Sequence, residues 1–169
     1  RPATLYGKCK HELQLKANSF CEKYQLNLCW GRIFFVYGPH EHPARLIPSV
    51  INSLLNKKTA ECTHGKQYRD LLYVEDVASG FVAMLCNKVT GVVNIGSGES
   101  SMLRNIIEMI GGKIGCSELI RLGSIPSRPG DPISLVADIS KLRRESGWSP
   151  NFDLESGLDK TIQWWKGLI

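Results

Sequence analysis

The chain has 169 residues, a formal net charge of +5 and a hydrophobic content of 43%, which suits one domain, or a domain with part of a second, built around a real core. Its basic residues are dispersed, with Lys57-Lys58 and Arg143-Arg144 as the longest basic runs, so the sequence does not indicate nucleic acid as a partner; a small anionic ligand suits it better. No apolar stretch is long enough to span a bilayer and no signal peptide is visible. We therefore expect a soluble, cytoplasmic protein without a membrane partner.

The first half of the chain predicts a helix, a strand, a helix and a strand in that order. Residues 6–26 have few helix breakers and an amphipathic pattern, which predicts a long helix. Residues 26–39 form an apolar run that predicts a strand stopped by Gly38-Pro39. After a polar loop, a helix is expected over 47–57 and a short strand over 59–63.

The second half continues the alternation of strands and helices. An apolar strand passes into a helix near Val74, with acidic residues in its first turn, where the helix dipole favours them. A buried strand is expected over 91–98, and a helix over 101–110 with Gly111-Gly112 as its stop. A Pro/Gly loop over 125–132 precedes two helices, at 139–146 and 154–167. The alternation indicates an α/β fold with at least partly parallel pairing.

The six cysteines show neither a CxxC pair nor the spacing of a zinc site. Several lie in apolar runs, as Cys29 and Cys86 do, where a thiol behaves as a small hydrophobic group. We therefore expect reduced cysteines rather than disulfides. His40, Glu41 and His42 are possible metal ligands, but adjacent side chains rarely point the same way, so a polar loop facing ligand or solvent is the preferred interpretation and no metal is predicted.

Tyr6 and Lys10 are four residues apart, about one helical turn, so their side chains share a helix face. A nearby positive charge favours the phenolate form, in which tyrosine is a base. An ordinary surface pair remains the alternative. The glycine-rich turn typical of dinucleotide sites is absent; Gly96-Ser97-Gly98 is a lone GxG after a strand, better interpreted as a turn than as a phosphate cradle.

Six segments occur in a recognisable order: RPATLYGKCK, GRIFFVYGP, RDLLYVEDVA, VVNIGSGE, RPGDP and ADISKLRRESGW. Together they resemble the extended short-chain dehydrogenase/reductases, specifically the nucleotide-sugar epimerases, dehydratases and 4-ketoreductases. The resemblance implies the C-terminal part of a Rossmann-type doubly wound sheet plus a small α/β substrate-binding domain. Residues 1–43 would end the Rossmann-type domain, and 44–169 would mainly bind substrate, with 91–110 returning to the Rossmann-type sheet.

The same resemblance implies a cofactor, NAD or NADP, and roles for three residues. Tyr6 would be the catalytic acid/base, Lys10 would orient the cofactor ribose, and backbone around Phe34 would flank the nicotinamide. The glycine-rich cofactor loop and the catalytic Ser/Thr of the family lie upstream of the tyrosine. We therefore expect a C-terminal fragment that is inactive alone.

The substrate would be a nucleotide sugar. Arginine grips diphosphate bidentately, and the arginines and aspartate that match Arg69, Arg128 and Asp131 bind the nucleotide diphosphate and its ribose in the family. Phe35 stands where relatives carry a substrate-binding asparagine, and Arg45 belongs to a loop that borders the substrate. The alternative for the arginines is a surface pairing with nearby aspartates.

Three functions stay open at this point: the enzyme, a non-catalytic sugar-nucleotide binding module, and a reductase of a steroid- or flavonoid-like ketone. The arginines argue against the third, because a neutral apolar substrate does not need them. Asp138 and Trp148 are expected to be capping and core residues. The family also implies a homodimer through the 6–26 helix, whose apolar stripe would otherwise be exposed.

Overall fold

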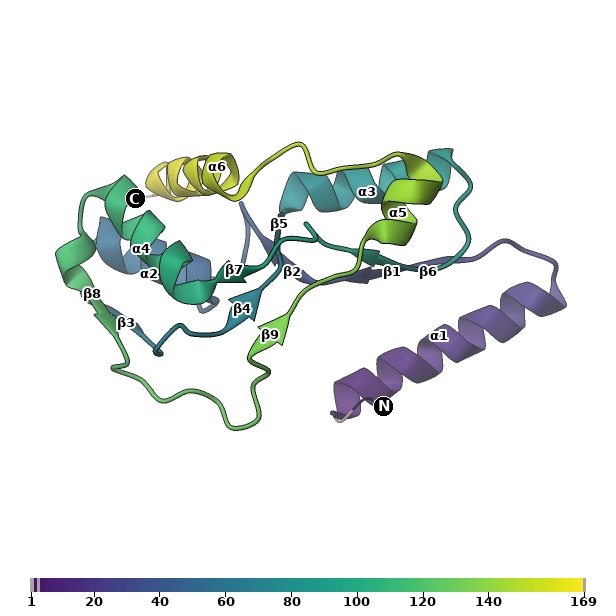
Figure 1. Cartoon of the computed structure of the whole chain (residues 1–169), viewed down its shortest axis with the longest axis horizontal. Helices are drawn as coiled ribbons and strands as arrows, with labels where there is room; N and C mark the ends of the chain where they lie inside the picture. Colours follow the sequence, from purple (N-terminus) through teal and green to yellow (C-terminus); the bar gives the residue numbers. More distant parts are fainter. Residues whose placement is uncertain (1, 3, 169) are drawn as a thin grey trace.

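The structure is a computed structural model that describes residue 2 and residues 4–168 (Figure 1). The helices are α1 (Leu5–Lys23), α2 (Leu46–Leu55), α3 (Val74–Cys86), α4 (Leu103–Ile114), α5 (Ser140–Ser146) and α6 (Leu154–Lys166), with a 3₁₀ turn η1 (Ser117–Leu119). The strands are β1 (Cys29–Ile33), β2 (Phe35–Tyr37), β3 (Ala60–Cys62), β4 (Tyr68–Arg69), β5 (Leu71–Tyr73), β6 (Gly91–Ile95), β7 (Ser101–Met102), β8 (Ile120–Leu122) and β9 (Ser134–Leu135).

Most strand pairs are parallel, as the alternation of strands and helices predicts. β1 pairs with β6, β2 with β5, β3 with β8 and β4 with β9, all in parallel register. The pair β4–β7 is antiparallel. The α/β fold class predicted from the sequence is therefore confirmed.

Two hydrophobic clusters hold the described chain together. One lies among α2, α4 and α6 and includes Ile51, Ile107 and Leu158. The other lies among β6, α3 and α5 and includes Val93 and Leu142. Figure 1 shows these two groups side by side, with α3 and α5 on one side of β1 and β6 and α1 on the other.

The alternation of side chains along β1 explains this layering. Gly31 faces α3, where a Cβ would lie only 2.8 Å from the ring of Phe81. Its neighbour Arg32 faces the opposite way and donates a hydrogen bond to Gln14 Oε1 of α1 at 3.0 Å. Gln14 is the one residue of α1 that is buried among the described residues.

Helix α1 begins directly after its N-cap residue, Thr4, and ends earlier than the sequence pattern predicts. The hydroxyl of Thr4 accepts a hydrogen bond from the Gly7 amide, which satisfies one of the free donors of the first turn. The predicted end at residue 26 is wrong, because the helix stops at Lys23 and Gln25 has a positive φ of 53°.

The predicted strand over 26–39 is two strands. β1 and β2 have different partners, β6 and β5, and Phe34 between them donates its amide to Ile95 O. The apolar run is continuous, so no residue type in it marks this change of partner.

The predicted stop of the fourth helix is also wrong. Helix α4 spans Leu103–Ile114, so Gly111 and Gly112 both lie inside it. The residue that caps its C-terminal end is Gly115, which has the left-handed conformation with φ 77°. Gly111 serves packing instead: a Cβ there would lie 2.5 Å from Ile120 Cδ1. The expected start at Val74 for α3, and the expected helices 139–146 and 154–167, agree with the structure to within one residue.

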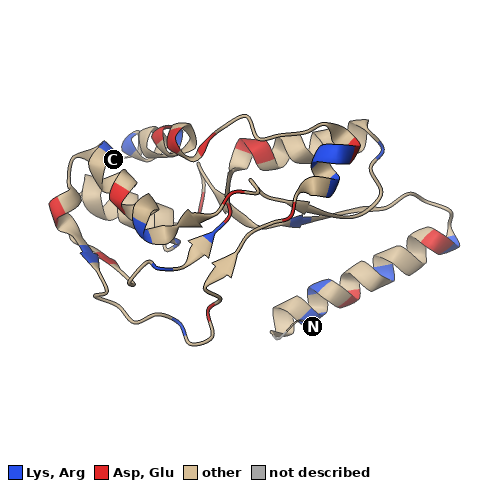
Figure 2. Ribbon diagram, in the orientation of Figure 1, with Lys and Arg blue, Asp and Glu red and all other residues tan. Residues whose placement is uncertain are grey.

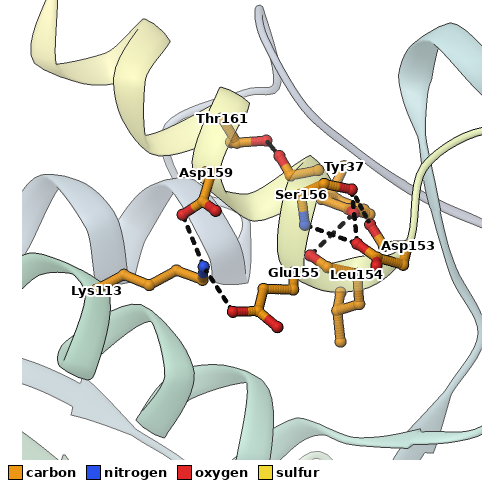
Figure 3. A network of polar contacts seen from close by, with 9 residues as sticks. Tyr37, Lys113, Asp153, Leu154, Glu155, Ser156, Asp159 and Thr161 are labelled. Atoms are coloured by element: carbon orange, nitrogen blue, oxygen red, sulfur yellow. Dashed lines mark hydrogen bonds and ion pairs between the residues drawn. The ribbon is translucent and has the colours of Figure 1, made fainter.

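The C-terminal helix is anchored by the polar contacts drawn in Figure 3. Asp153 accepts a hydrogen bond from the Ser156 amide at the start of α6. Lys113 of α4 reaches both Asp159 and Glu155, at 2.7 and 3.5 Å. These contacts fix α6 against α4 above the first hydrophobic cluster.

The segment 91–110 is divided between two parts of the fold. Strand β6 pairs with β1, whereas α4 packs with α2 and α6. The division of the chain into two domains at residue 43 stays a prediction. Trp148 is buried and donates to Ser79 Oγ, and the Asp138 carboxylate accepts from the Ser140 amide. In the described part of the chain no helix is both long and apolar enough to cross a membrane.

Candidate functional site

A pocket of about 310 Å³ opens beside the first hydrophobic cluster, whose Ile47, Leu71 and Leu103 line it, and we call it the arginine pocket. Five residues singled out from the sequence line it together: Phe35, Arg45, Arg69, Arg128 and Asp131. They come from four separate segments: β2, the loop before α2, β4 and the loop between β8 and β9. The volume lies in the range usual for small-molecule sites.

Arg69 is the fixed centre of this pocket. It is 5% exposed, and its Nη2 donates to Asp131 Oδ1 at 2.7 Å. Its Nη1 donates to the carbonyls of Tyr68 and Pro132, and its guanidinium carbon lies 5.4 Å from the centroid of the Phe35 ring. The expected alternative, a pairing of Arg69 with Asp131, therefore exists, and it holds the loop that carries Arg128 against β4.

The other two arginines are more exposed. Arg45 lies 3.7 Å from Glu41 Oε1, one turn of chain before it, with a side chain that is 62% exposed. Arg128 is exposed, in the loop over 123–133. With Arg69 neutralised by Asp131, Arg45 and Arg128 supply the positive charge that this pocket can offer to an anion. Figure 2 shows Lys and Arg scattered over the ribbon of the described residues rather than gathered in one stripe.

Two acceptor oxygens in the pocket are buried without a hydrogen-bond partner among the described residues: Glu41 Oε2 and Gln67 Oε1. Gln67 is 7% exposed, and its amide nitrogen donates to Asp131 Oδ2 at 3.2 Å. Burial raises the pKa of Glu41 to about 7, although Arg45 acts in the opposite direction. Unpaired buried acceptors are costly, so these two oxygens mark where a ligand's donors fit.

The three consecutive polar residues after β2 point to three different partners. The His40 ring stacks on Trp164 of α6, with 4.7 Å between the centroids. Glu41 lines the arginine pocket, and His42 Nδ1 accepts the amide of Ala44 at 3.2 Å. Among the described residues, no group of three His, Cys, Asp or Glu side chains is placed to hold a metal ion.

Tyr6 and Lys10 lie one above the other on α1, outside the arginine pocket. The Lys10 ammonium is 5.7 Å from the centroid of the Tyr6 ring, and the ring is 73% exposed. Lys10 instead borders a shallow hollow between α1 and β1, together with Trp30 and Arg32. A phenol and an ammonium side by side and exposed have the donor chemistry that suits a ribose and a hydroxyl, so they fit the nicotinamide-ribose end of a dinucleotide.

Two backbone amides of the turn Gly96-Ser97-Gly98 are hydrogen-bonded to a side chain of the protein itself. The amides of Ser97 and Gly98 donate to the two carboxylate oxygens of Asp70, at 2.6 and 3.0 Å. Ala137 donates a further amide to Asp70, which is 0% exposed. These amides therefore do not cradle a phosphate, and the interpretation of the segment as a turn holds. Phe34, named for its backbone, has its amide bonded to Ile95 O and its ring packed against the second cluster.

Sequence reasoning missed several pocket residues: Thr63, Gln67 and Leu103, and the placement of Glu41 beside Arg45. One signal was available, because Gln67 stands two residues before Arg69 and alternate residues of an extended segment share a face. For Glu41, Thr63 and Leu103 the spacing carries no such signal, since two of them lie in different loops and Leu103 is the first residue of α4.

Comparison with known proteins finds relatives that are named as nucleotide-sugar enzymes. The family model described as "NAD dependent epimerase/dehydratase family" matches residues 1–96. A dTDP-glucose 4,6-dehydratase of Neisseria gonorrhoeae is 32% identical over 178 residues, covering 97% of this chain and 51% of that protein. This chain spans about half the length of the curated relatives it matches.

Solved structures agree over the whole fold. A UDP-N-acetylglucosamine 4-epimerase of Methanobrevibacter ruminantium M1, in complex with UDP-N-acetylmuramic acid, is 28% identical with a TM-score of 0.92 and covers 100% of this chain and 56% of its own. A UDP-glucuronic acid 4-epimerase of Bacillus cereus, solved with UDP-glucuronic acid and NAD, is 30% identical with a TM-score of 0.89, covering 100% and 55%.

These likenesses confirm a Rossmann-type fold. The family match covers more than half of the chain, so the chain belongs to the NAD dependent epimerase/dehydratase family.

Proposed function

We propose that the arginine pocket binds the nucleotide diphosphate of a nucleotide sugar, and that this chain is the substrate-binding part of an NAD(P)-dependent nucleotide-sugar epimerase, dehydratase or 4-ketoreductase. The observation that carries the proposal is the convergence of Arg45, Arg69 and Arg128 from separate segments on one pocket. A diphosphate needs such donors, whereas a neutral ketone does not.

Each arginine has its own part in binding. Arg69 is held by Asp131 and Phe35, so its remaining N–H groups are fixed before a ligand arrives. Arg128 is exposed and free to turn toward an incoming phosphate, whereas Arg45, also exposed, faces Glu41 Oε1 at 3.7 Å. A fixed arginine beside exposed ones suits a ligand that enters from solvent and is then enclosed.

In the chemical step, Tyr6 would take the proton of a sugar hydroxyl or return it. Lys10 would donate hydrogen bonds to the ribose of the cofactor and stabilise the phenolate of Tyr6 by its charge. When bound, NAD(P) supplies the group that accepts and returns the sugar's electrons. Among the described residues, Tyr6 and Lys10 suit the nicotinamide-ribose end of that cofactor. The amides of Ser97 and Gly98 already donate to Asp70, so they do not bind its phosphates.

Calorimetry of this chain against UDP, dTDP, GDP and CDP tests the binding proposal. Charged hydrogen bonds are worth about 1.5–3 kcal/mol each, so two or three arginines sustain a dissociation constant from about micromolar to millimolar. We expect at least one nucleotide to bind, and NAD to bind far more weakly because the chain has no glycine-rich phosphate loop.

Arg128→Ala is the decisive variant, and Arg143→Ala is its matched control, because Arg143 is an exposed arginine on α5 outside the arginine pocket. Loss of one phosphate contact should weaken binding about tenfold or more, while the control binds as the wild type does. Equal affinity of Arg128→Ala and wild type, or no binding of any nucleotide, would refute the pocket assignment.

The catalytic part of the proposal is tested by Tyr6→Phe in a preparation that turns over a nucleotide sugar. Proton transfer by a positioned side chain contributes about 10²–10⁴ in rate, so kcat should fall by that factor with nucleotide-sugar affinity nearly unchanged. A variant that keeps more than about a tenth of the wild-type kcat contradicts the role.

A non-catalytic binding module is the second candidate, and one observation favours it: neither Tyr6 nor Lys10 lines the arginine pocket. Under this alternative, nucleotide sugars bind but Tyr6→Phe changes nothing measurable in any preparation.

We further propose a homodimer through α1. We also expect that the 169-residue chain alone does not turn over a nucleotide sugar.

A further inference from the structure

Glu41 is an acidic residue in the arginine pocket, and the binding of a diphosphate does not account for its presence there. A carboxylate opposes the binding of an anion, yet this one lies inside the pocket with a side chain that is 17% exposed. One of its oxygens, Oε1, faces Arg45 at 3.7 Å. The other, Oε2, is buried and has no hydrogen-bond partner among the described residues.

The two acidic residues of the pocket are arranged differently. Asp131 uses both oxygens within the protein, on Arg69 and Gln67, at 2.7 and 3.2 Å. Its charge and these two hydrogen bonds therefore hold the pocket together. Glu41 keeps one buried acceptor oxygen without a partner among the described residues, so this oxygen is available to a ligand.

We propose, resting on the proposed nucleotide-sugar binding, that Glu41 selects a sugar with neutral hydroxyl groups over a sugar acid. Its free oxygen Oε2 accepts a hydrogen bond from a sugar hydroxyl. Its other oxygen sits against Arg45, which is the place where the carboxylate of a uronate would otherwise pair with a guanidinium. A uronate would thus meet a carboxylate instead of a free arginine.

Charge within the pocket supports the same selection. Three arginines and two carboxylates line it, and Asp131 already neutralises Arg69. The remaining positive charge, on Arg45 and Arg128, is opposed by Glu41 and suits a diphosphate without a further anionic group. A third negative group placed beside Glu41 is repelled. The pocket therefore disfavours the sugar acid by charge repulsion and favours the neutral sugar by a hydrogen bond.

Competition calorimetry on this chain at pH 8, where Glu41 with its pKa of about 7 is mostly ionised, tests the inference with UDP-glucose and UDP-glucuronate, repeated with the dTDP analogues if UDP itself does not bind. We expect wild type to bind the glucose form more tightly by about ten- to a hundredfold, the range that a charged hydrogen bond contributes. Glu41→Gln keeps the size of the side chain but removes its charge and frees Arg45. The preference should then fall to about threefold or less, or reverse, while affinity for UDP should not fall, because the variant removes a negative charge from the pocket.

A second variant separates the two parts of the argument. Arg45→Gln added to Glu41→Gln should abolish the gain in uronate binding, because that gain depends on the freed guanidinium. Melting curves of each variant establish that it is folded. The inference is overturned if wild type binds both sugars equally or prefers the uronate, or if Glu41→Gln leaves the ratio unchanged. If no nucleoside diphosphate binds at all, the proposed function fails first, and this selection fails with it.

Discussion

Asp70 is the residue on which three segments of the chain depend. Its Oδ1 accepts the amide and hydroxyl of Ser97 at 2.6 and 2.8 Å, and its Oδ2 accepts the amides of Gly98 and Ala137 at 3.0 Å each. It adjoins Arg69, so the same strand end that holds the arginine also ties β6 to the segment before α5. A fully buried carboxylate is tolerated here because every direction around it supplies a donor.

Asp70→Asn should therefore lower the free energy of unfolding by about 3 kcal/mol or more. The amide nitrogen of asparagine replaces one acceptor and faces N–H groups that it cannot satisfy. Denaturant titration measures the change. Asp159→Asn is the matched control, because that exposed carboxylate makes a surface ion pair with Lys113 and should cost only about 0–1 kcal/mol. Similar losses for the two variants would contradict the role given to Asp70.

Glu41 makes stability depend on pH in a direction opposite to that of most carboxylates. Its folded-state pKa is about 7, raised by burial from 4.5, so the folded state binds the proton more tightly than the unfolded state does. Stability from this group is then highest below about pH 4.5 and is lost as the pH rises to about 7.

Glu41→Gln removes this loss. At pH 8 the variant should be more stable than wild type by up to about 3 kcal/mol, and at pH 4 the two should be nearly equal. Thermal or denaturant unfolding at both pH values measures the difference. Glu61→Gln, at an exposed position of β3, is the control and should show little change at either pH. A variant equally stable relative to wild type at both pH values would rule out a raised pKa.

At the scale of elements, α4 shows that two adjacent glycines serve different purposes. A Cβ on Gly111 would lie 2.5 Å from Ile120 Cδ1 and 3.2 Å from the backbone of Ser117, so the small residue lets η1 and β8 approach the helix. A Cβ on Gly112 would meet nothing within 4 Å. The helix ends at neither, but at Gly115, where φ is positive.

Alanine at the two positions should have opposite effects on the free energy of unfolding. Gly112→Ala should raise it by about 0.5–1 kcal/mol, because glycine is a poor helix former. Gly111→Ala should lower it by about 1–3 kcal/mol through overpacking. Denaturant titration of both variants is the measurement, and each serves as the other's control. The same sign for both would show that the packing against Ile120 is not limiting.

At the scale of the whole molecule, α1 lies on one side of β1 and β6 (Figure 1), and Gln14 is its one buried residue among those described. Leu13, Phe20 and Tyr24 follow one face of it and are each more than half exposed. An amphipathic helix that leaves this much apolar surface in solvent favours association with another apolar surface. This is the surface that we propose to form the homodimer.

Phe20→Gln should weaken self-association about tenfold or more, since burying a phenylalanine is worth about 1.5–3 kcal/mol. Sedimentation equilibrium across micromolar concentrations measures it. Leu85→Gln is the control, because Leu85 is 81% exposed on α3, away from the α1 face. A wild-type chain that stays monomeric throughout, or equal weakening by both variants, would exclude α1 as the interface.

Patterns that extend over many neighbouring residues were sufficient to predict the α/β fold class and most helices. The start of α3 at Val74 and the helices α5 and α6 follow from local periodicity and breakers. The order of six short motifs likewise indicated the family. The helices are determined by the sequence alone because the side chains that decide them are within one or two helical turns of each other.

What only the tertiary structure decided is which residues meet. The split of 26–39 into β1 and β2 depends on which strands lie beside each half, and the packing role of Gly111 inside α4 depends on how closely β8 approaches. The pairing of Arg69 with Asp131, across 62 residues of chain, and the free oxygen of Glu41 in the same pocket, depend on where distant loops close. No local pattern encodes these distances, because they are set by how segments far apart in the chain pack on the first hydrophobic cluster, beside which the pocket opens.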